Sequence, residues 1–312
     1  MSSATASFEG LKRMLRSPGM IGLVWIANFA VALPLAVAVG GAIHASIKKS
    51  DVHQELLEGF DTGWHAEFAS DHGGVVGSFS PAHVGVGSWL NNLDNWWDGS
   101  LFSEEPTVVA AGLLFALIWL FLVGGVIEAL REGAPRARIT AVLADGATRF
   151  PRLVRLAAIT GVFYYLVFRL ARWIFSRISD ATIDFTVERD VLVYNLAGAC
   201  LVVLMLATVR LVSDYAKVSV VLERRRSALL AAWRGLRFVV SNPVRVFVVA
   251  LAYGLMAVAL VFVYSKLAPG AAESSPLAIV GALLWSQLFL AVKFSLRVAL
   301  LGAEVALFER AA

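Results

Sequence analysis

Long apolar runs, separated by shorter polar and basic stretches, dominate the pattern of this chain. A helix needs about 20 apolar residues to cross roughly 30 Å of hydrocarbon. Runs of that length lie near residues 19–43, 107–128, 153–174, 191–212, 246–265 and 276–296. They lack the in-and-out alternation of a barrel strand, so the pattern predicts helices. We therefore expect an all-α fold, a polytopic bundle of six transmembrane helices.

A second, shorter pattern precedes the first, third and fifth of these runs. Each time a basic amphipathic stretch reaches a Gly and then a Pro, at residues 10–18 and 235–243 with the same spacing, and in a shorter copy at 146–151. Because Pro ends one helix and is tolerated in the first turn of the next, each Pro is expected to form an elbow. The pattern predicts three tandem units, each an elbow helix followed by a transmembrane hairpin.

Details of the helix boundaries also follow from the sequence. Ser274 and Ser275 precede Pro276, which predicts a helix with a Ser N-cap and Pro in its first turn. No Pro occurs between residues 191 and 240, so the fourth helix is expected to continue beyond its span. The first run is longer than the apolar core of a signal peptide and matches the repeat, so we expect a retained anchor.

We expect one membrane domain over residues 1–312, with repeat units at about 1–130, 131–222 and 223–312. The stretch 44–106 is rich in Trp, Phe and Gly, and is expected to form an extracytoplasmic cap loop rather than a bare linker. Within it, residues 91–97 are predicted to lie at the level of the lipid headgroups, where Trp is favoured.

Composition and charge place these elements in a membrane and orient them. The chain is 59% hydrophobic and 16% charged, too little polar material to cover a soluble globule of this length. Residues 131–155 carry six Arg and 210–245 carry eight basic residues, whereas 44–106 carry two Lys against ten acids. The positive-inside rule then predicts a multi-pass plasma-membrane protein with both termini cytoplasmic. The net charge of +4 reflects these flanking residues, so no nucleic-acid partner is expected.

Ionisable residues near the predicted cytoplasmic side form a candidate polar cluster: Glu128, Arg131, Arg210, Asp214, Lys293 and Arg297, with Glu304 beside them. An unpaired charge in hydrocarbon costs about 2.5 kcal/mol or more, so pairing between helices or snorkelling is expected. Arg210 and Asp214 are four residues apart, which predicts an ion pair on one helix face. A site for an anionic headgroup or for ions is the alternative interpretation.

Basic residues before the fifth run are candidate contacts for lipid headgroups: Arg224, Arg225, Arg226, Arg234 and Arg237. The stretches before the first and fifth runs also have apolar side chains on one helical face, among them Phe8, Leu11, Met14, Leu15, Leu229, Leu230, Trp233, Leu236 and Phe238. Such a pattern is typical of a helix that lies in the headgroup layer. Membrane lipids are therefore the expected partners, together with a protein partner.

All five histidines lie between residues 44 and 83, in the predicted loop. The tightest group of possible metal ligands comprises His65, Glu67, Asp71 and His72, with Asp61 nearby. Imidazole and carboxylate groups together can bind Zn²⁺. Their spacing matches no established metal signature, so a solvated acidic loop is the competing interpretation.

Motifs that carry nucleotide or nucleophile chemistry are absent from the sequence. It contains no Gly-x-x-x-x-Gly-Lys-Ser/Thr, no Gly-x-Ser-x-Gly and no Cys-x-x-Cys. No stretch outside the apolar runs is long enough for a soluble domain that hydrolyses ATP. We expect no cofactor, and the sequence favours a protein without catalytic activity.

The segment 209–218, followed by Leu222-Glu223-Arg224-Arg225 and a basic stretch to Asn242-Pro243, resembles a pattern of uncharacterised six-span bacterial membrane proteins. These are akin to the membrane domain of glycerophosphoryl diester phosphodiesterase. The phosphodiesterase catalytic domain has no counterpart in this sequence, so the resemblance implies neither that activity nor its metal. It implies only the six-span elbow architecture in a bacterial membrane.

Three functional hypotheses follow. The leading one is a non-catalytic scaffold or partner subunit that contacts lipid. The second is a small permease or lipid-handling transporter with a cavity between the hairpins. The third is a metal-dependent activity carried by the His-rich loop.

Overall fold

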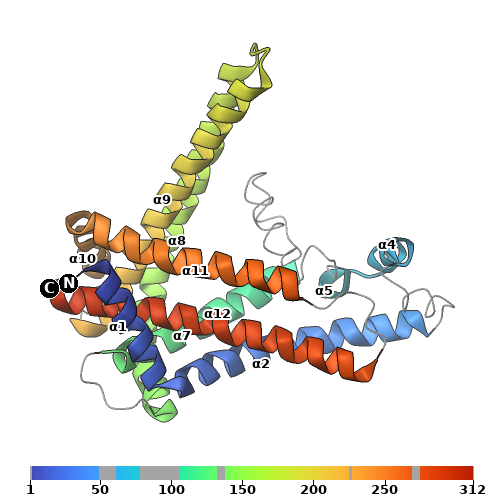
Figure 1. Cartoon of the computed structure of the whole chain (residues 1–312), viewed down its shortest axis with the longest axis horizontal. Helices are drawn as coiled ribbons and strands as arrows, with labels where there is room; N and C mark the ends of the chain where they lie inside the picture. Colours follow the sequence, from blue (N-terminus) through green and yellow to red (C-terminus); the bar gives the residue numbers. More distant parts are fainter. Residues whose placement is uncertain are drawn as a thin grey trace. The chain divides into compact units, whose positions relative to one another are not determined.

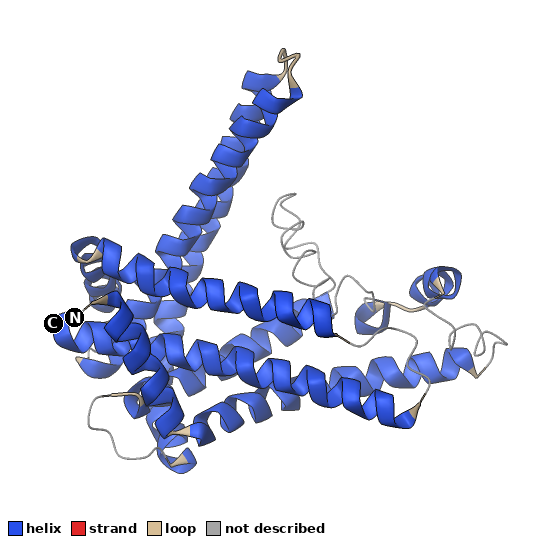
Figure 2. Ribbon diagram, viewed as in Figure 1, coloured by secondary structure: helices blue, strands red, loops and turns tan. Residues whose placement is uncertain are grey.

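In the computed structural model of this chain, every regular element among the described residues is a helix (Figures 1 and 2). The described residues are 2–48, 61–77, 106–131, 138–224, 227–268 and 275–311. Six of the helices are long and apolar enough to cross a membrane. The expectation of an all-α protein with six candidate spans is therefore confirmed.

The described helices follow one another in the order α1 (Ser3–Arg16), α2 (Pro18–Ile47), α4 (Thr62–Asp71), α5 (Gly74–Gly77), α7 (Pro106–Ala129), α8 (Ile139–Thr182), α9 (Glu188–Leu222), α10 (Ala228–Ser241), α11 (Pro243–Leu267) and α12 (Pro276–Ala311). The six candidate spans are α2, α7, α8, α9, α11 and α12. Helix α9, the fourth candidate span, is longer than a crossing requires, because it has 35 residues and about 20 suffice.

Short polar side chains begin several of these helices. The hydroxyl of Ser275 accepts a hydrogen bond from the backbone N–H of Ala278 at 3.2 Å, directly before Pro276, so the predicted start of α12 is confirmed. Ser2 caps α1 and Ser227 caps α10 in the same way. Each cap satisfies an N–H group that the first helical turn leaves without an intrahelical acceptor.

The expected break at Pro151 is wrong. Helix α8 runs without interruption from Ile139 to Thr182 and contains Pro151. A Pro inside a helix removes one backbone hydrogen bond and costs about 3 kcal/mol. Residues on both sides of Pro151 are buried on one helical face, at Gly146, Arg149, Leu153 and Leu156, and this packing offsets that cost.

The chain separates into two compact units. Unit 1 comprises residues 1–17, 120–252 and 299–312, and unit 2 comprises residues 18–119 and 253–298. These two units are defined by contacts between residues, so they do not test the predicted sequence repeat. All the basic segments that oriented the chain fall in unit 1, and the His-rich stretch falls in unit 2.

Unit 1 is held together by helix pairs. Helices α8 and α9 lie side by side as a hairpin (Figure 1), and α10 packs on both. Aromatic rings join α10 to its neighbours: Phe238 of α10 lies 4.6 Å from Tyr215 of α9 and 5.0 Å from Phe308 of α12, between ring centroids. Large buried apolar side chains of this kind supply most of the packing free energy.

Close backbone contacts of three glycines fix the helices of unit 1 at short separation. A side-chain carbon at Gly10 of α1 would overlap the carbonyl oxygen of Ala299 in α12. The same is true of Gly146 in α8 against Phe121 of α7, and of Gly235 in α10 against Val212 of α9. Small residues let helix backbones approach each other in this way.

Unit 2 contains two short helices, α4 and α5, which pack on each other and, through α5, on α2. Asp61 caps α4 by accepting hydrogen bonds from the N–H groups of Gly63 and Trp64. The rings of Trp64, Phe68 and His72 stack in succession along α4. These two helices lie within the stretch 44–106 that was predicted as a cap, and the cap itself stays a prediction. The predicted interfacial segment 91–97 lies outside the described residues.

Candidate functional site

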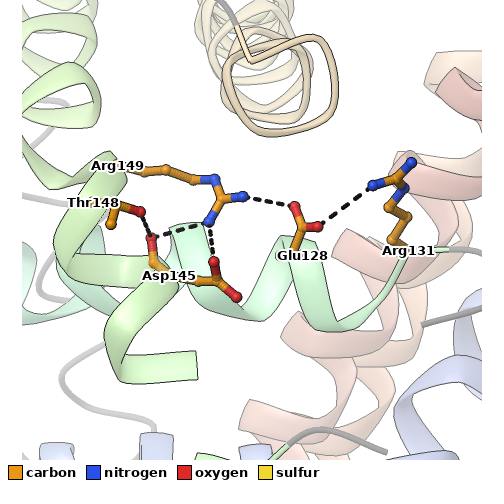
Figure 3. Close-up of polar contacts among 5 residues, drawn as sticks. All are labelled: Glu128, Arg131, Asp145, Thr148 and Arg149. Atoms are coloured by element: carbon orange, nitrogen blue, oxygen red, sulfur yellow. Dashed lines mark hydrogen bonds and ion pairs between the residues drawn. The ribbon is translucent and has the colours of Figure 1, made fainter. Parts of the chain in front are cut away.

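The end of α7 carries the best-defined polar cluster of the described chain (Figure 3). Arg149 of α8 donates to Glu128 of α7 at 2.8 Å and to Asp145, one turn earlier in α8, at 2.7 Å. Arg131 lies 3.5 Å from the other oxygen of Glu128. We call Glu128, Arg131, Asp145, Thr148 and Arg149 the Arg149 cluster.

Burial makes the Arg149 cluster a structural contact between helices. The Arg149 side chain is only 10% exposed, because Gly146 brings α8 onto α7 one turn earlier. A planar guanidinium can bind two carboxylates at once, which a Lys ammonium does with less directional preference. Sequence reasoning chose Glu128 and Arg131 but missed Arg149. Its position three residues after Gly146, on the buried face, was the signal that could have found it.

A second arginine joins α1 to the ends of two other helices. Arg13, whose side chain is 4% exposed, donates to the backbone oxygen of Leu130 at 2.9 Å and to Glu309 of α12 at 2.8 Å. Glu9, one turn earlier in α1, lies 3.3 Å away. The Leu130 carbonyl directly follows α7, where the helix dipole favours a cation. We call Glu9, Arg13, Leu130 and Glu309 the Arg13 cluster.

A third arginine, Arg234 of α10, lies 3.1 Å from Glu223, the C-cap of α9. Glu223 also accepts a hydrogen bond from Ser219 at 2.8 Å. The Arg234 guanidinium lies over the ring of Phe308, 5.7 Å from its centroid. We call Ser219, Glu223 and Arg234 the Arg234 cluster. In each of the three clusters an arginine binds an acid near the C-terminal end of α7, α9 or α12.

Helix α9 places Arg210, Asp214 and Lys217 along one stripe. Asp214 accepts a hydrogen bond from Lys217 at 2.6 Å, and the Arg210 guanidinium lies 3.8 Å from its other oxygen. The predicted Arg210–Asp214 ion pair is therefore present, and Lys217 is the stronger partner by distance. Lys217 is not among the predicted cluster residues, although its spacing of i, i+3 from Asp214 is the usual signal for such a pair.

A buried carboxylate lies near this stripe. Glu304 of α12 is 1% exposed, and neither of its carboxylate oxygens has a hydrogen-bond partner among the described residues. The hydroxyl of Tyr215, itself fully buried, also has none among them. Glu304 is within electrostatic range of Asp214 and Lys217. Burying a polar group without a partner is costly, which makes this pair of side chains unusual within unit 1.

The remaining residues of the predicted polar cluster lie on the part of α12 that belongs to unit 2. The Arg297 guanidinium lies 3.8 Å from the ring centroid of Trp119 in α7, a cation–π contact. Lys293 lies one helical turn from Arg297 and within its electrostatic range. The six residues of the predicted cluster thus do not form one group: Glu128 pairs with Arg131 and Arg210 pairs with Asp214, whereas Lys293 and Arg297 are two cations on neighbouring turns of α12.

The predicted headgroup arginines differ in their surroundings. Arg237 is exposed on α10, and Arg224 follows α9 with a positive φ of 50°. Arg234 points toward Glu223 and Phe308 rather than away from the protein. Arg225 and Arg226 lie outside the described residues.

The predicted metal ligands lie on or next to α4. His65, Glu67 and Asp71 are within this helix and His72 follows it. The His72 ring is occupied by its own helix, since its Nδ1 lies 2.9 Å from the Phe68 carbonyl oxygen. Within the described ranges, no group of three or more His, Cys, Asp or Glu residues could hold a metal ion.

The outer surface of the long helices is rich in exposed apolar side chains. Leu192 of α9, Leu251 of α11 and Leu283 of α12 are among many large apolar side chains that remain exposed on the candidate spans. Contiguous apolar surface on this scale is incompatible with water and matches hydrocarbon. The fold therefore defines a multi-pass membrane protein.

Comparisons with protein-family models, curated proteins and solved structures gave no match to this chain.

Proposed function

We propose that this protein is a non-catalytic component of a bacterial inner membrane, a scaffold or partner subunit that contacts anionic lipid. One observation carries the proposal: α1 and α10 expose apolar side chains beside cations, and each leads directly into a candidate span. On α1, Phe8, Leu11 and Leu15 line a surface hollow of about 360 Å³ together with Lys12 and Arg16. A helix with this surface binds the interface through its apolar face and anionic headgroups through its cations.

Helix α10 supports the same interpretation. Leu229, Leu230 and Trp233 are exposed, and Trp233 is 64% exposed. Phe238, and Met14 on α1, had been expected on the lipid face but are buried in the protein. The apolar residues that remain outside therefore have no packing role in unit 1, and contact with lipid accounts for them.

The proposal includes three tandem repeat units and cytoplasmic termini. The repeat is supported by a contact that recurs in each unit. Gly146 and Gly235 each lie against the backbone of the preceding long helix, and Gly10 lies against the backbone of α12, the last helix. The location of all the basic segments in one compact unit supports a common side for them. Kinship with the membrane domain of glycerophosphoryl diester phosphodiesterase belongs to the same proposal.

Purification from native membranes in polymer-bounded discs tests this function. We expect anionic phospholipid to be enriched around the wild-type protein relative to the bulk membrane, and a protein partner to be present at a fixed ratio. Replacing Lys12, Arg16 and Arg237 with Gln should reduce the enrichment. The control is the exposed Arg177, which lies near the C-terminal end of α8 and outside α1 and α10, so replacing it should leave the enrichment unchanged. Bulk lipid composition around the wild type, with no stoichiometric protein, would contradict the proposal.

A second candidate function, ion-coupled transport by a small permease, is favoured by Glu304. Ionisable groups buried in membrane proteins commonly mark ion or proton pathways. Glu304 and the Tyr215 hydroxyl supply two oxygen-bearing groups without partners among the described residues.

Proteoliposomes loaded with a pH-sensitive dye test the transport hypothesis under an imposed potassium diffusion potential. Transport predicts proton flux above that of protein-free vesicles, and loss of this flux in Glu304→Gln. The control is Glu309→Gln, which alters another acid of α12 that binds Arg13. Flux equal to that of empty vesicles, or an undiminished flux in Glu304→Gln, would rule out this role for Glu304.

A further inference from the structure

Two arginines beside one pocket are not used by any contact described so far. Arg245 lies in the first turn of α11, and Arg310 lies in the last turn of α12. Both line the same pocket, and both side chains are exposed. Among the described residues, neither guanidinium makes a hydrogen bond or an ion pair. This distinguishes them from Arg13, Arg149 and Arg234, each of which binds an acid.

The rest of the pocket is neutral. Its other lining residues are Phe238, Asn242, Val246, Leu307 and Ala311. No acid is among these lining residues, so neither guanidinium has a carboxylate partner within the pocket lining. Asn242 donates from its amide nitrogen to the Phe238 carbonyl at 3.3 Å, which holds the side chain at the pocket and leaves a second amide hydrogen for a ligand.

We propose that this pocket, formed by Asn242, Arg245 and Arg310, binds the phosphate group of an anionic ligand. Guanidinium groups match the geometry of phosphate oxygens and form charge-assisted hydrogen bonds with them. The pocket lies at the N-terminal turn of α11, whose dipole favours an anion, and beside the last turn of α12, whose dipole favours the Arg310 cation. The space inside this open pocket is about 20 Å³, roughly that of one ordered water. One phosphate oxygen therefore enters, and the remainder of the ligand stays at the mouth.

The position of the pocket along the chain indicates where such a phosphate comes from. Pro243 begins a candidate span, so the first turn of α11 lies at the depth of the lipid headgroups. A phospholipid phosphate and a free phosphate share the chemistry that the pocket recognises. The lipid source rests on the proposed function of contact with anionic lipid, and the phosphate site itself does not.

Native mass spectrometry of the purified full chain, with added phosphatidylglycerol, tests the site. Removing one charged partner weakens such a contact about tenfold. We therefore expect Arg245→Ala and Arg310→Ala each to lower the affinity for one phosphatidylglycerol by about that factor, and the double variant to abolish this binding. Arg177→Ala is the matched control, because Arg177 is exposed on α8 and does not line the pocket.

Inorganic phosphate is the second probe of the site. Thermal stabilisation of the wild type by inorganic phosphate, absent in the Arg245→Ala/Arg310→Ala variant, supports the site even if no lipid is bound and the proposed function fails. Lipid binding that depends on both arginines, without any effect of inorganic phosphate, supports the site with a lipid as its ligand. If the double Ala variant does not fold, the Arg245→Lys/Arg310→Lys variant replaces it. This variant keeps both charges but lacks the guanidinium geometry, so it should bind both probes more weakly than the wild type. Equal binding of both probes by the wild type and the folded double variants would overturn the proposal.

Discussion

At the scale of single residues, arginine side chains decide how the helices of unit 1 meet. Arg13, Arg149 and Arg234 each bind an acid on a different helix, at 2.8, 2.8 and 3.1 Å respectively. Two of these arginines are almost fully buried. An ion pair buried in this way need not stabilise a fold more than apolar packing would, but removing one partner is costly because the other charge remains buried. We therefore expect these pairs to act mainly by disfavouring other helix arrangements.

Arg149→Met should lower the free energy of unfolding by on the order of 3 kcal/mol, since Glu128 would lose its closest cation. Denaturation in detergent micelles measures this change. In a double-mutant cycle, Glu128→Gln combined with Arg149→Met should cost clearly less than the sum of the single changes. The matched control is Arg177→Met, whose partner Asp180 lies 3.9 Å away on an exposed surface; a loss within about 0.5 kcal/mol is expected there. Additive costs at Glu128 and Arg149 would show that the pair does not couple α7 to α8.

At the scale of the helices, spacing between backbones is set by glycine. The contacts of Gly10, Gly146 and Gly235 leave no space for a side-chain carbon. Other glycines in the same helices are different: a carbon at Gly161, further along α8, would meet nothing within 4 Å. A sequence contains both kinds of glycine without distinguishing them, unless a repeated motif marks one kind.

Gly146→Ala should destabilise the protein by about 1 to 3 kcal/mol, because the added methyl group overlaps the Phe121 carbonyl and forces α8 away from α7. Gly161→Ala in the same helix should be neutral or stabilising by up to about 1 kcal/mol, because Ala is the better helix former. Thermal unfolding of both variants, followed by circular dichroism, compares them directly. If Gly161→Ala were the more damaging change, close packing at Gly146 would not be what holds these helices together.

Predictions from the sequence succeeded where a local pattern determines the outcome. Apolar run length predicted six candidate spans, and Ser275 with Pro276 predicted the start of α12. The predicted helix break at Pro151 was wrong because α8 is buried on both sides of this residue, and that burial outweighs the lost hydrogen bond. No local pattern in the sequence reports such burial. Arg149 and Arg13 were missed for a related reason. An arginine in a basic stretch looks solvated until the partner helix, 21 or 296 residues away, is known to lie beside it.

At the scale of the whole molecule, the distribution of charge between the compact units bears on topology. The basic segments all belong to unit 1 and the His-rich stretch to unit 2. Six candidate spans would return the chain to its starting side, and both the α1 segment and the end of α12 belong to unit 1. The orientation with both termini cytoplasmic stays a prediction, and it does not depend on the repeat.

Cysteine labelling tests that orientation. Cys200 is the single cysteine, so Cys200→Ser provides a background without thiols. A membrane-impermeant maleimide should label Ser70→Cys, in α4, on intact cells. It should label Arg237→Cys, on α10, only after the cells are permeabilised. Both positions are exposed, so accessibility within the protein does not explain a difference. Labelling of both on intact cells would contradict the topology.

The Arg13 cluster has a consequence for how the protein is made. Arg13 and Glu309 are separated by 296 positions, so α1 leaves the ribosome long before α12 exists. At about 5–20 residues per second, the delay is roughly 15 to 60 seconds. During that time the face of α1 that later packs on α12 is exposed. The apolar side of α1 can lie on the membrane surface meanwhile. Closure of unit 1 is then among the last steps of biogenesis, and a translational pause before Ala299 would leave a target for membrane quality control.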